Sequence, residues 1–293
     1  MRDTRVLIEK ARTFIEAMPY IKRYWQNTIV VKTGGRAMEE KEALRSFVQD
    51  VLMLHLVGMR PVIVHGGGTQ ISDLMRRLDQ QPTFVDGYRV TGSDELDSVR
   101  MALQKTNKEM VSLLNAQGDY GVGLSGEDAN LIRASRMTGA EGKDLGFVGE
   151  IERVEPRVIN GLIGSGFIPV VAPMGVDTNG QVYNINADHA AGAIAAALGA
   201  AKLVYLTDVE GLYEDFGEED SLLSKVSVSE LETLLASGKL HSGMIPKVRS
   251  CIDALKGGVE RAHILDGRVE HALQLEIFTD QGVRTMVQQR ASC

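Results

Sequence analysis

Three consecutive glycines follow a short, strongly apolar run, and this stretch is well suited to binding chemistry. Residues 62–64 read Val-Ile-Val, which is typical of a buried strand, and residues 66–68 are all glycine. Apolar side chains then recur at helical spacing from Ile71 onward. Glycine lets the backbone approach a ligand closely, and the free N–H groups of a helix N-terminus favour an anion. Taken alone, the stretch fits a phosphate site and a plain strand-to-helix turn equally well.

Two lysines occupy positions where an anion would be expected. Lys32 ends the predicted strand at 28–32 and is followed, after one residue, by a glycine pair. Ligands of open parallel sheets bind outside the carboxyl ends of the strands, which places Lys32 where it could meet a phosphate group. Lys247 lies at the predicted start of a helix, where a cation opposes the macrodipole and needs an anionic partner. For both lysines the alternative is a solvated side chain without a role.

Amide, carboxylate and guanidinium groups complete the candidate site. Asn184, Asn186 and Asp188 are spaced by two residues, so in an extended segment their side chains project to one side. Asp188 also stands where a helix N-cap is expected, which is the simpler explanation of that residue. Arg89 follows a glycine in a polar extended segment, and arginine can hold a carboxylate through two parallel hydrogen bonds. The alternative for Arg89 is a surface ion pair.

Several other chemistries are disfavoured. The glycine run continues neither as the Gly-Lys-Ser/Thr of a P-loop nor as the Gly-x-Gly-x-x-Gly of a dinucleotide-binding dehydrogenase. His65 has no second His or Cys at ligand spacing, so we expect a hydrogen-bonding residue there and no metal held by the protein itself. No Gly-x-Ser-x-Gly elbow or Cys/His constellation indicates covalent catalysis.

The elements that would carry these groups alternate along the chain. A strand at 28–32, a helix at 39–57 and a strand at 60–64 predict a parallel sheet. Residues 130–154 are expected to form hairpins, and residues 173–183 to be rich in turns. Further strands are expected at 121–124, 168–172, 202–207, 261–265 and 283–287. Further helices are expected at 4–24, 94–116, 156–164, 189–198, 228–236, 245–255 and 269–275, with Ser93 and Ser227 as caps.

Composition limits the kind of protein that this chain can be. Its 293 residues suffice for one large domain or two lobes, and 44% hydrophobic with 24% charged residues is an ordinary globular profile. A net charge of −7 argues against nucleic acid and anionic membranes as partners. The two cysteines, Cys251 and Cys293, have no metal-binding spacing, so a reducing cytoplasm is the expected location.

Six motifs together resemble the amino-acid kinase family. They are Val30-Val-Lys32-Thr-Gly-Gly35, Val62-Ile-Val-His65-Gly-Gly-Gly68, Gly87-Tyr-Arg89-Val-Thr91, Asn184-Ile-Asn186-Ala-Asp188, Thr207-Asp-Val-Glu-Gly211-Leu-Tyr213 and Gly243-Met-Ile-Pro-Lys247. The resemblance implies an α/β fold, namely an open three-layer αβα sandwich with a mainly parallel central sheet, plus an N-terminal helix. It divides the chain into an oligomerisation helix at 1–26 and a kinase domain at 27–293. Residues 27–175 would form the lobe for the acyl substrate, and residues 176–293 the lobe for ATP.

The resemblance also implies an activity. The family transfers the γ-phosphoryl group of ATP, with Mg²⁺, to a carboxylate. The branch most similar to this chain phosphorylates the γ-carboxylate of N-acetyl-L-glutamate in the second step of arginine biosynthesis. Carried over motif by motif, the catalytic residues would be Lys32, Lys247 and Asp188. The phosphate would meet the backbone N–H groups of Gly34, Gly35, Gly66 and Gly67, and the acyl substrate would contact Gly66, Gly67, Arg89, Asn184 and Asn186. The nucleotide would contact Thr207, Asp208, Gly211, Leu212, Tyr213 and Met244.

One branch of the family is hexameric and inhibited by arginine, and the N-terminal segment resembles that branch. Residues Glu16-Ala-Met-Pro19-Tyr20 match its N-terminal helix, whose apolar stripe would pack on a neighbouring subunit or, alternatively, on its own domain. Pro19 is expected to kink or end that helix. By the same resemblance, His263, Glu276 and Gly282 would form the arginine site of a homo-hexamer built as a trimer of dimers.

The chain departs from the family pattern at several positions. Thr33 and Arg36 replace a tyrosine and an asparagine beside the first glycine pair, Glu127 replaces a lysine, and Arg284 replaces a glycine. Two alternatives therefore stay open, a kinase of a related carboxylate and a catalytically silent module that senses arginine. Degenerate catalytic lysines would mark the silent module, and here both lysines are present.

Overall fold

A computed structural model of the chain describes residues 4–35, 40–85, 87–215, 218–241, 243–279 and 285–290. Its helices are α1 (Thr4–Tyr24), α2 (Lys41–Leu56), α3 (Gly68–Arg77), α4 (Ser93–Asn115), α5 (Arg157–Gly164), α6 (Ala187–Ala197), α7 (Val228–Ser237), α8 (Ile245–Lys256) and α9 (Ala272–Phe278). Its strands are β1 (Thr28–Thr33), β2 (Arg60–His65), β3 (Phe84–Val85), β4 (Tyr88–Arg89), β5 (Gly121–Ser125), β6 (Ile132–Thr138), β7 (Asp144–Val154), β8 (Ile168–Ala172), β9 (Met174–Val176), β10 (Val182–Ile185), β11 (Lys202–Thr207), β12 (Lys225–Ser227), β13 (Arg261–Asp266) and β14 (Thr285–Gln288).

The described strands build one eight-stranded sheet in the order β12-β14-β13-β11-β1-β2-β8-β5. Neighbouring strands pair in parallel, except that β14 runs antiparallel to β13. The register aligns Lys32 on β1 with Tyr205 on β11 and with Val64 on β2. The carboxyl ends of these three strands therefore meet at one edge of the sheet, where ligands of parallel sheets bind.

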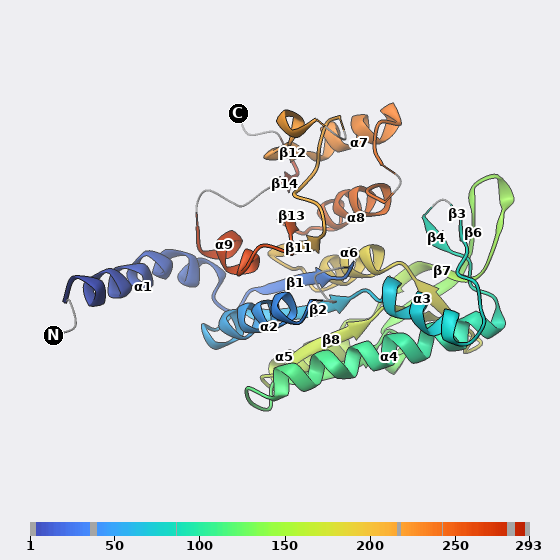
Figure 1. Ribbon diagram of the computed structural model, residues 1–293, viewed down its shortest axis with the longest axis horizontal. Helices are drawn as coiled ribbons and strands as arrows, with labels where there is room; N and C mark the ends of the chain where they lie inside the picture. The colour runs from blue at the N-terminus through green and yellow to red at the C-terminus, as the bar shows by residue number, and fades with distance from the viewer. Residues whose placement is uncertain are drawn as a thin grey trace.

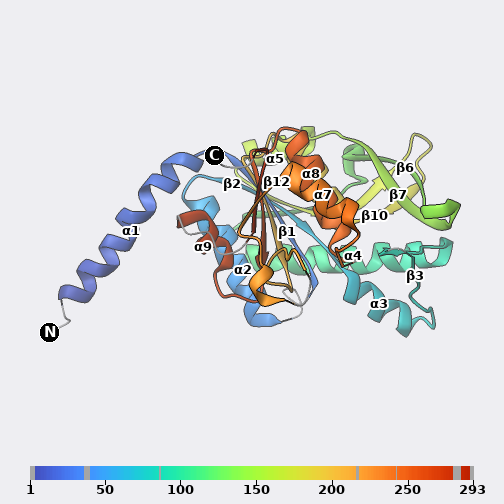
Figure 2. The ribbon, with the colours of Figure 1, turned by 90° about the horizontal axis from the view of Figure 1, so that it is seen from above.

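Helices cover both faces of this sheet, as the two views show (Figure 1, Figure 2). On one face, Ile29 and Val31 pack against apolar side chains of α2, α4 and α9. On the other face, Val30 and Val62 pack against α5, α6, α7 and α8. Alternate residues of one strand are thus buried on opposite sides, which is why these strands are apolar without interruption. The predicted three-layer αβα sandwich is confirmed.

A small closed barrel of β10, β7, β6 and β9 lies beside the sheet. The antiparallel pair β6–β7 confirms the predicted hairpin within residues 130–154. The prediction of turns at 173–183 is wrong in part, because β9 and the start of β10 lie there and pair with each other. The glycine and asparagine residues of this segment are typical of turns, so the two short barrel strands were not predicted from the sequence. The barrel matters for function because β10 leads directly into α6.

Several helix boundaries differ from the sequence predictions. The helix α1 continues through Pro19, so this proline does not end it. Gly92, and not Ser93, occupies the N-cap of α4. The helix predicted at 269–275 lies three residues later, as α9. Ser227 caps α7 in a capping box, as predicted.

The first helix extends away from the rest of the molecule in both views, with the N-terminus at its far end (Figure 1, Figure 2). Its apolar side chains are exposed among the described residues, with 68% of Phe14, 62% of Ile15 and 61% of Met18 accessible. Packing of this stripe on its own domain is therefore not what the fold shows. None of the helices in the described ranges has both the length and the apolar content needed to cross a bilayer.

Candidate functional site

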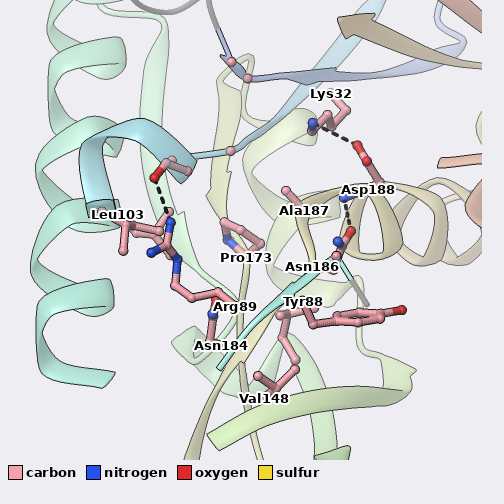
Figure 3. Close-up of a pocket in the computed structure, with 18 of the residues that line it drawn as sticks. Lys32, Tyr88, Arg89, Leu103, Val148, Pro173, Asn184, Asn186, Ala187 and Asp188 are labelled. Atoms are coloured by element: carbon pink, nitrogen blue, oxygen red, sulfur yellow. Dashed lines mark hydrogen bonds and ion pairs between the residues drawn. The ribbon is translucent and has the colours of Figure 1, made fainter. Parts of the chain in front are cut away.

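Two cavities open at the carboxyl edge of the sheet and share a wall. The first, of about 290 Å³, lies between the glycine run, the β3–β4 hairpin and the start of α6 (Figure 3). The second, of about 410 Å³, lies between the end of β11 and the start of α8. Four residues line both cavities: Lys32, Gly34, Gly35 and Asp188. Ligands bound in the two cavities would therefore meet at these residues.

Lys32, Asp188 and Lys247, which we call the lysine–aspartate triad, stand at this junction. The Nζ of Lys32 lies 2.8 Å from Oδ1 of Asp188, and the Nζ of Lys247 lies 3.0 Å from Oδ2. Burial acts to raise the pKa of Asp188, but the two ammonium groups outweigh burial and hold that pKa below its ordinary value. Burial lowers the pKa of Lys247. The carboxylate thus stays ionised and occupied by cations, which suits it to position the lysines rather than to act as a base.

Arg89 lies inside the first cavity and not on the surface. Its side chain is 7% exposed and donates hydrogen bonds to the carbonyl oxygen of Gly68 and to Oγ of Ser72, each at 2.8 Å. The guanidinium group also lies 4.7 Å from the ring centroid of Phe84. Burial, together with the charge of Arg76, lowers the pKa of Arg89 to about 10, so the group remains a cation at neutral pH. The surface ion pair considered for Arg89 is therefore wrong.

Asn184 and Arg89 are joined by a residue for which the sequence suggested no role. Nδ2 of Asn184 donates to Oγ1 of Thr91 at 3.2 Å, and Thr91 donates to the backbone carbonyl oxygen of Arg89 at 2.9 Å. Thr91 is fully buried. Its place two residues after Arg89 in an alternating segment was the available signal.

Asn186, rather than Asp188, caps α6. Oδ1 of Asn186 accepts from the N–H groups of Asp188 at 2.9 Å and of His189 at 3.2 Å. The simpler explanation of Asp188 as a cap is therefore wrong, and its carboxylate is available to the two lysines. Figure 3 shows Asn184, Asn186 and Asp188 around the same cavity, as their spacing predicted.

The two glycine loops touch each other beside Lys32. The N–H of Gly66 donates to the carbonyl oxygen of Thr33 at 2.7 Å, so the prediction that Gly66 offers this N–H to a phosphate is wrong. Gly66 still lines the first cavity, together with Gly67. A Cβ on Gly34 would lie 3.3 Å from Nζ of Lys32, so glycine leaves that ammonium group its space.

His65 is a buried hydrogen-bonding residue, as predicted. Nδ1 lies 2.9 Å from the carbonyl oxygen of Gly66, and Nε2 lies 3.2 Å from Nδ2 of Asn107. Because the amide of Asn107 is a donor, Nε2 accepts and Nδ1 carries the proton. Burial lowers the pKa of His65 to about 4, so the ring is neutral at neutral pH.

The predicted nucleotide residues divide into two groups. Thr207, Asp208 and Met244 line the second cavity, and so does His241, which the motifs did not single out. Gly211, Leu212 and Tyr213 are not among the residues that line either of the two cavities. Leu212 is 1% exposed, so its contact with a nucleotide stays a prediction. The described ranges contain no cluster of three or more acidic, His or Cys side chains that could hold a metal.

The predicted effector residues form a second buried charge cluster. Oε1 of Glu276 lies 2.8 Å from Nδ1 of His263 and 2.9 Å from Nζ of Lys202. Burial acts to raise the pKa of Glu276, but His263 and Lys202 hold it at about 2. Lys202 was missed, although a lysine opening an apolar strand was a signal. Gly282 lies outside the described residues.

Of the four departures from the family pattern, two lie within the described residues and two lie outside them. Glu127 forms an ion pair with Arg100 at 2.8 Å, so the replacement has a partner of opposite charge. Thr33 is 1% exposed at the end of β1. Arg36 and Arg284 lie outside the described residues.

Known proteins resemble this chain in both sequence and fold. Residues 27–266 match the Amino acid kinase family. The chain is 51% identical over 287 residues to the acetylglutamate kinase of Symbiobacterium thermophilum, with 96% of this chain and 98% of that protein covered.

Solved structures extend the likeness. N-acetylglutamate synthase from Neisseria gonorrhoeae, complexed with coenzyme A and N-acetyl-glutamate, has a TM-score of 0.84 and 26% identity. The match covers 96% of this chain but 64% of the synthase chain. Carbamate kinase from Giardia lamblia bound to AMP-PNP shares the fold, with a TM-score of 0.67, 16% identity and coverage of 90% and 99%. Because the family match spans most of the sequence and a relative is about half identical over nearly its full length, the chain belongs to the amino acid kinase family.

Proposed function

We propose that this protein transfers the γ-phosphoryl group of ATP to the γ-carboxylate of N-acetyl-L-glutamate. The product is N-acetylglutamyl 5-phosphate, an intermediate of arginine biosynthesis. A relative 51% identical to the chain bears the name acetylglutamate kinase, and the chain is an enzyme of this kind. The observation that carries the proposal is the lysine–aspartate triad at the junction of two cavities, because two anionic substrates must meet there.

Each cavity suits one substrate. In the first, Arg89 would clamp the α-carboxylate of the acyl substrate, and Asn184 would bind its acetamido group or carboxylate. In the second, Thr207, Asp208 and Met244 would contact the nucleotide. Residues 27–175 would accordingly form the acyl-substrate lobe and residues 176–293 the ATP lobe.

The chemistry requires charge neutralisation more than proton transfer. The attacking carboxylate is already ionised, so a bond forms between its oxygen and the γ-phosphorus while the bond from that phosphorus to ADP breaks. No proton moves, and no general base is needed. Lys32 and Lys247 would neutralise the transferring group from opposite sides, and N–H groups of Gly34, Gly35 and Gly67 would add hydrogen bonds. Mg²⁺ would be held largely by the nucleotide phosphates and would neutralise part of their charge.

Regulation and assembly belong to the same proposal. Arginine would bind beside the cluster of His263, Glu276 and Lys202, where the Glu276 carboxylate already pairs with cationic or hydrogen-bonding partners and would also attract a guanidinium group. The C-terminal end of α1 lies beside this cluster, since Nζ of Lys202 is 5.3 Å from the ring centroid of Tyr24. The exposed apolar stripe of α1 would pack on another subunit and link dimers into a hexamer. The enzyme would work in the cytoplasm.

The test of the activity is a hydroxamate trap for acyl phosphate. Purified protein is incubated with ATP, Mg²⁺, hydroxylamine and, in separate reactions, N-acetyl-L-glutamate, N-acetyl-L-aspartate, L-glutamate and L-aspartate. Hydroxamate is expected with N-acetyl-L-glutamate. Product with the free amino acids alone would refute the proposal, and product with none of them would indicate the silent module.

A further inference from the structure

A buried chain of hydroxyl groups lies directly beneath the lysine–aspartate triad. Tyr205 is fully buried on β11, and the parallel register places it beside Lys32. Its Oη lies 2.6 Å from Oγ of Ser250, and that Oγ lies 2.5 Å from the backbone carbonyl oxygen of Asp188. Oη of Tyr205 is itself 3.4 Å from the same carbonyl oxygen.

The available protons give this chain a direction. A carbonyl oxygen can only accept, so the single proton of Ser250 goes to Asp188 and the proton of Tyr205 goes to Ser250. Burial raises the pKa of Tyr205 well above its ordinary value, so the phenol remains a donor at working pH. Both hydroxyl groups therefore act on the first turn of α6, which carries the Asp188 carboxylate.

Tyr205 also lies against the second lysine of the triad. Nζ of Lys247 is 5.0 Å from the centroid of the Tyr205 ring, within the range of a cation–π interaction. Ser250 follows Lys247 by three residues on α8, so one face of that helix supplies both groups. The close approach of α6 to α8 depends on Gly192, because a Cβ there would lie 2.3 Å from Oγ of Ser250.

We propose that Tyr205 and Ser250 are positioning residues for phosphoryl transfer, a role that rests on the proposed kinase function. The hydroxyl chain holds the backbone of Asp188, and the ring holds the ammonium group of Lys247. The triad thereby keeps one geometry while the phosphoryl group passes. A residue that merely filled the core could be apolar, as Leu203 is, two positions earlier in the same buried cluster.

The pKa of Lys247 can be measured, and a change in core packing alone would not shift it. Asp188 on α6 favours its charged form, and Lys32 on β1 disfavours it. Cys251 on α8 stays neutral because burial raises its pKa to about 12, and Tyr205 on β11 stays neutral for the same reason. Loss of the Tyr205 ring would lower the pKa of Lys247. Because activity requires charged Lys247, the alkaline limb of the pH–activity profile would shift to lower pH.

The test compares Tyr205→Phe, Tyr205→Leu and Ser250→Ala, with kcat expressed per folded enzyme. Tyr205→Phe and Ser250→Ala should each lower kcat by roughly three- to tenfold, the usual effect of one buried hydrogen bond, without moving the alkaline limb. Tyr205→Leu should lower kcat further and move that limb to lower pH by roughly half a pH unit to one pH unit. The KM for N-acetyl-L-glutamate should stay unchanged in all three.

Controls separate the role from folding and from the proposed function. Tyr183→Phe, which removes a hydroxyl that donates to Asp177 outside the triad, should leave kcat unchanged. The double variant Tyr205→Phe/Ser250→Ala should be no slower than either single variant, because the hydroxyl chain acts as a unit. This cycle still decides the matter if Tyr205→Leu does not fold. Additive losses, or wild-type kcat and pH profile in the Tyr205 variants, would overturn the inference.

A readout without substrate keeps the two proposals distinguishable. Failure of wild-type protein to form acyl phosphate from N-acetyl-L-glutamate would refute the proposed function alone. The titration of Lys247, followed by NMR in ligand-free protein with labelled lysine, needs no turnover. A lower pKa of Lys247 in Tyr205→Leu than in Tyr205→Phe would support the inference, and identical titrations would contradict it.

Discussion

Each ionisable group of the site is placed so that its charge at neutral pH is the one phosphoryl transfer needs. Asp188 is kept ionised by two ammonium groups, while Arg89 stays a cation despite its burial. His65, by contrast, is kept neutral by burial. A neutral His65 holds a carbonyl group of the glycine loop, whereas a charged one would add a fourth cation to Lys32, Lys247 and Arg89.

The first prediction concerns the two lysines. Lys32→Ala and Lys247→Ala should each lower kcat by roughly a hundredfold or more, as loss of a charge contact in the transition state does. Folding should change little, because Asp188 keeps the other lysine as a partner. Steady-state kinetics and circular dichroism measure both effects. Lys105→Ala, at a lysine whose side chain is 75% exposed, is the control and should keep wild-type kcat. Wild-type turnover in either triad variant would remove the role assigned to it.

The second prediction concerns Arg89. Arg89→Ala should raise the KM for the acyl substrate by roughly tenfold or more, because a buried bidentate contact with a carboxylate is lost. The KM for ATP should stay near the wild-type value, since Arg89 lines the first cavity. Initial rates with each substrate varied in turn give both constants, with Arg153→Ala on an exposed position as the control. Equal weakening of both substrates would argue against a carboxylate clamp.

The third prediction concerns acid stability and His65. In the folded protein its pKa is about 4, against an ordinary 6.5, so between these values the unfolded state binds more protons. The stabilisation is therefore complete above 6.5 and is lost as the pH falls toward 4. Between about pH 7.5 and about pH 5 the wild type should lose about 2 kcal/mol more unfolding free energy than His65→Asn.

Urea unfolding at the two pH values measures this loss for both proteins. Between about pH 7.5 and about pH 9 the two proteins should change in parallel, which is the internal control, because a group with the pKa of His65 does not titrate there. The same acid slope in His65→Asn and wild type would show that His65 is not buried neutral.

Asn107 on α4 connects three strands of the sheet at the scale of elements. Its Nδ2 lies 2.9 Å from the carbonyl oxygen of Val170 on β8, 3.3 Å from that of Leu124 on β5 and 3.2 Å from His65 at the end of β2. One amide group thus ties a helix to the strand ends that carry the glycine loop. Space for it is left by Gly123, because a Cβ there would lie 1.9 Å from Oδ1 of Asn107.

The fourth prediction compares two glycine-to-alanine changes in neighbouring elements. Gly123→Ala should lower the free energy of unfolding by about 1–3 kcal/mol, because the added methyl group forces Asn107 to move. Gly161→Ala on α5 meets nothing within 4 Å and should raise stability by up to about 1 kcal/mol, since alanine favours a helix. Urea denaturation of both variants tests the pair. A neutral Gly123→Ala would mean that Asn107 does not hold the strands together.

The same region shows why letters alone do not define a motif. Residues 121–126 read Gly-Val-Gly-Leu-Ser-Gly, which matches the spelling of a dinucleotide fingerprint. In the fold, Gly121 and Gly123 lie within β5, and the glycines do not form a strand-to-helix turn. This match to the motif therefore does not indicate a nucleotide-binding site at residues 121–126.

On the scale of the whole molecule, α1 is the helix whose apolar side is not packed against the rest of the described chain. A helix that exposes several large apolar side chains to solvent would be stabilised by another surface that covers them. The C-terminal end of α1, in contrast, packs against the core through Tyr24, which is 4% exposed. This arrangement would couple subunit contacts along α1 to the cluster of Lys202, His263 and Glu276.

The fifth prediction tests this coupling. The full chain should be a hexamer whose activity arginine lowers, and a chain starting at Asn27 should be a dimer insensitive to arginine. Because truncation also removes Tyr24, the double variant Phe14→Glu/Met18→Glu, which alters the exposed stripe alone, is the matched comparison. Light scattering and activity at increasing arginine give both readouts. A full-length dimer indifferent to millimolar arginine would refute the proposal.

The sequence by itself determined the layered architecture and most of the site. Uninterrupted Val and Ile runs are typical of strands buried on both faces of a parallel sheet, so the strand–helix alternation predicted the parallel sheet correctly, while the three-layer sandwich was implied by the family resemblance. Lys32 and Lys247 could be identified because they stand beside glycines or at a helix start, where a charged side chain needs a partner, whereas the role of Arg89 came from the family resemblance. These signals are local, and a single sequence displays them directly.

What only the tertiary structure decided are pairings between residues far apart in the chain. Asp188 meets a lysine 59 positions away, and Tyr205 meets a serine 45 positions away, and no local pattern encodes such distances. Capping of α6 was only an alternative for Asp188, because aspartate and asparagine are both good caps, and the tertiary contacts show that Asn186 is the cap while Asp188 pairs with the two lysines. The buried N–H of Gly66 and the role of Lys202 likewise depend on which elements pack together, since burial and hydrogen-bond partners belong to the folded chain.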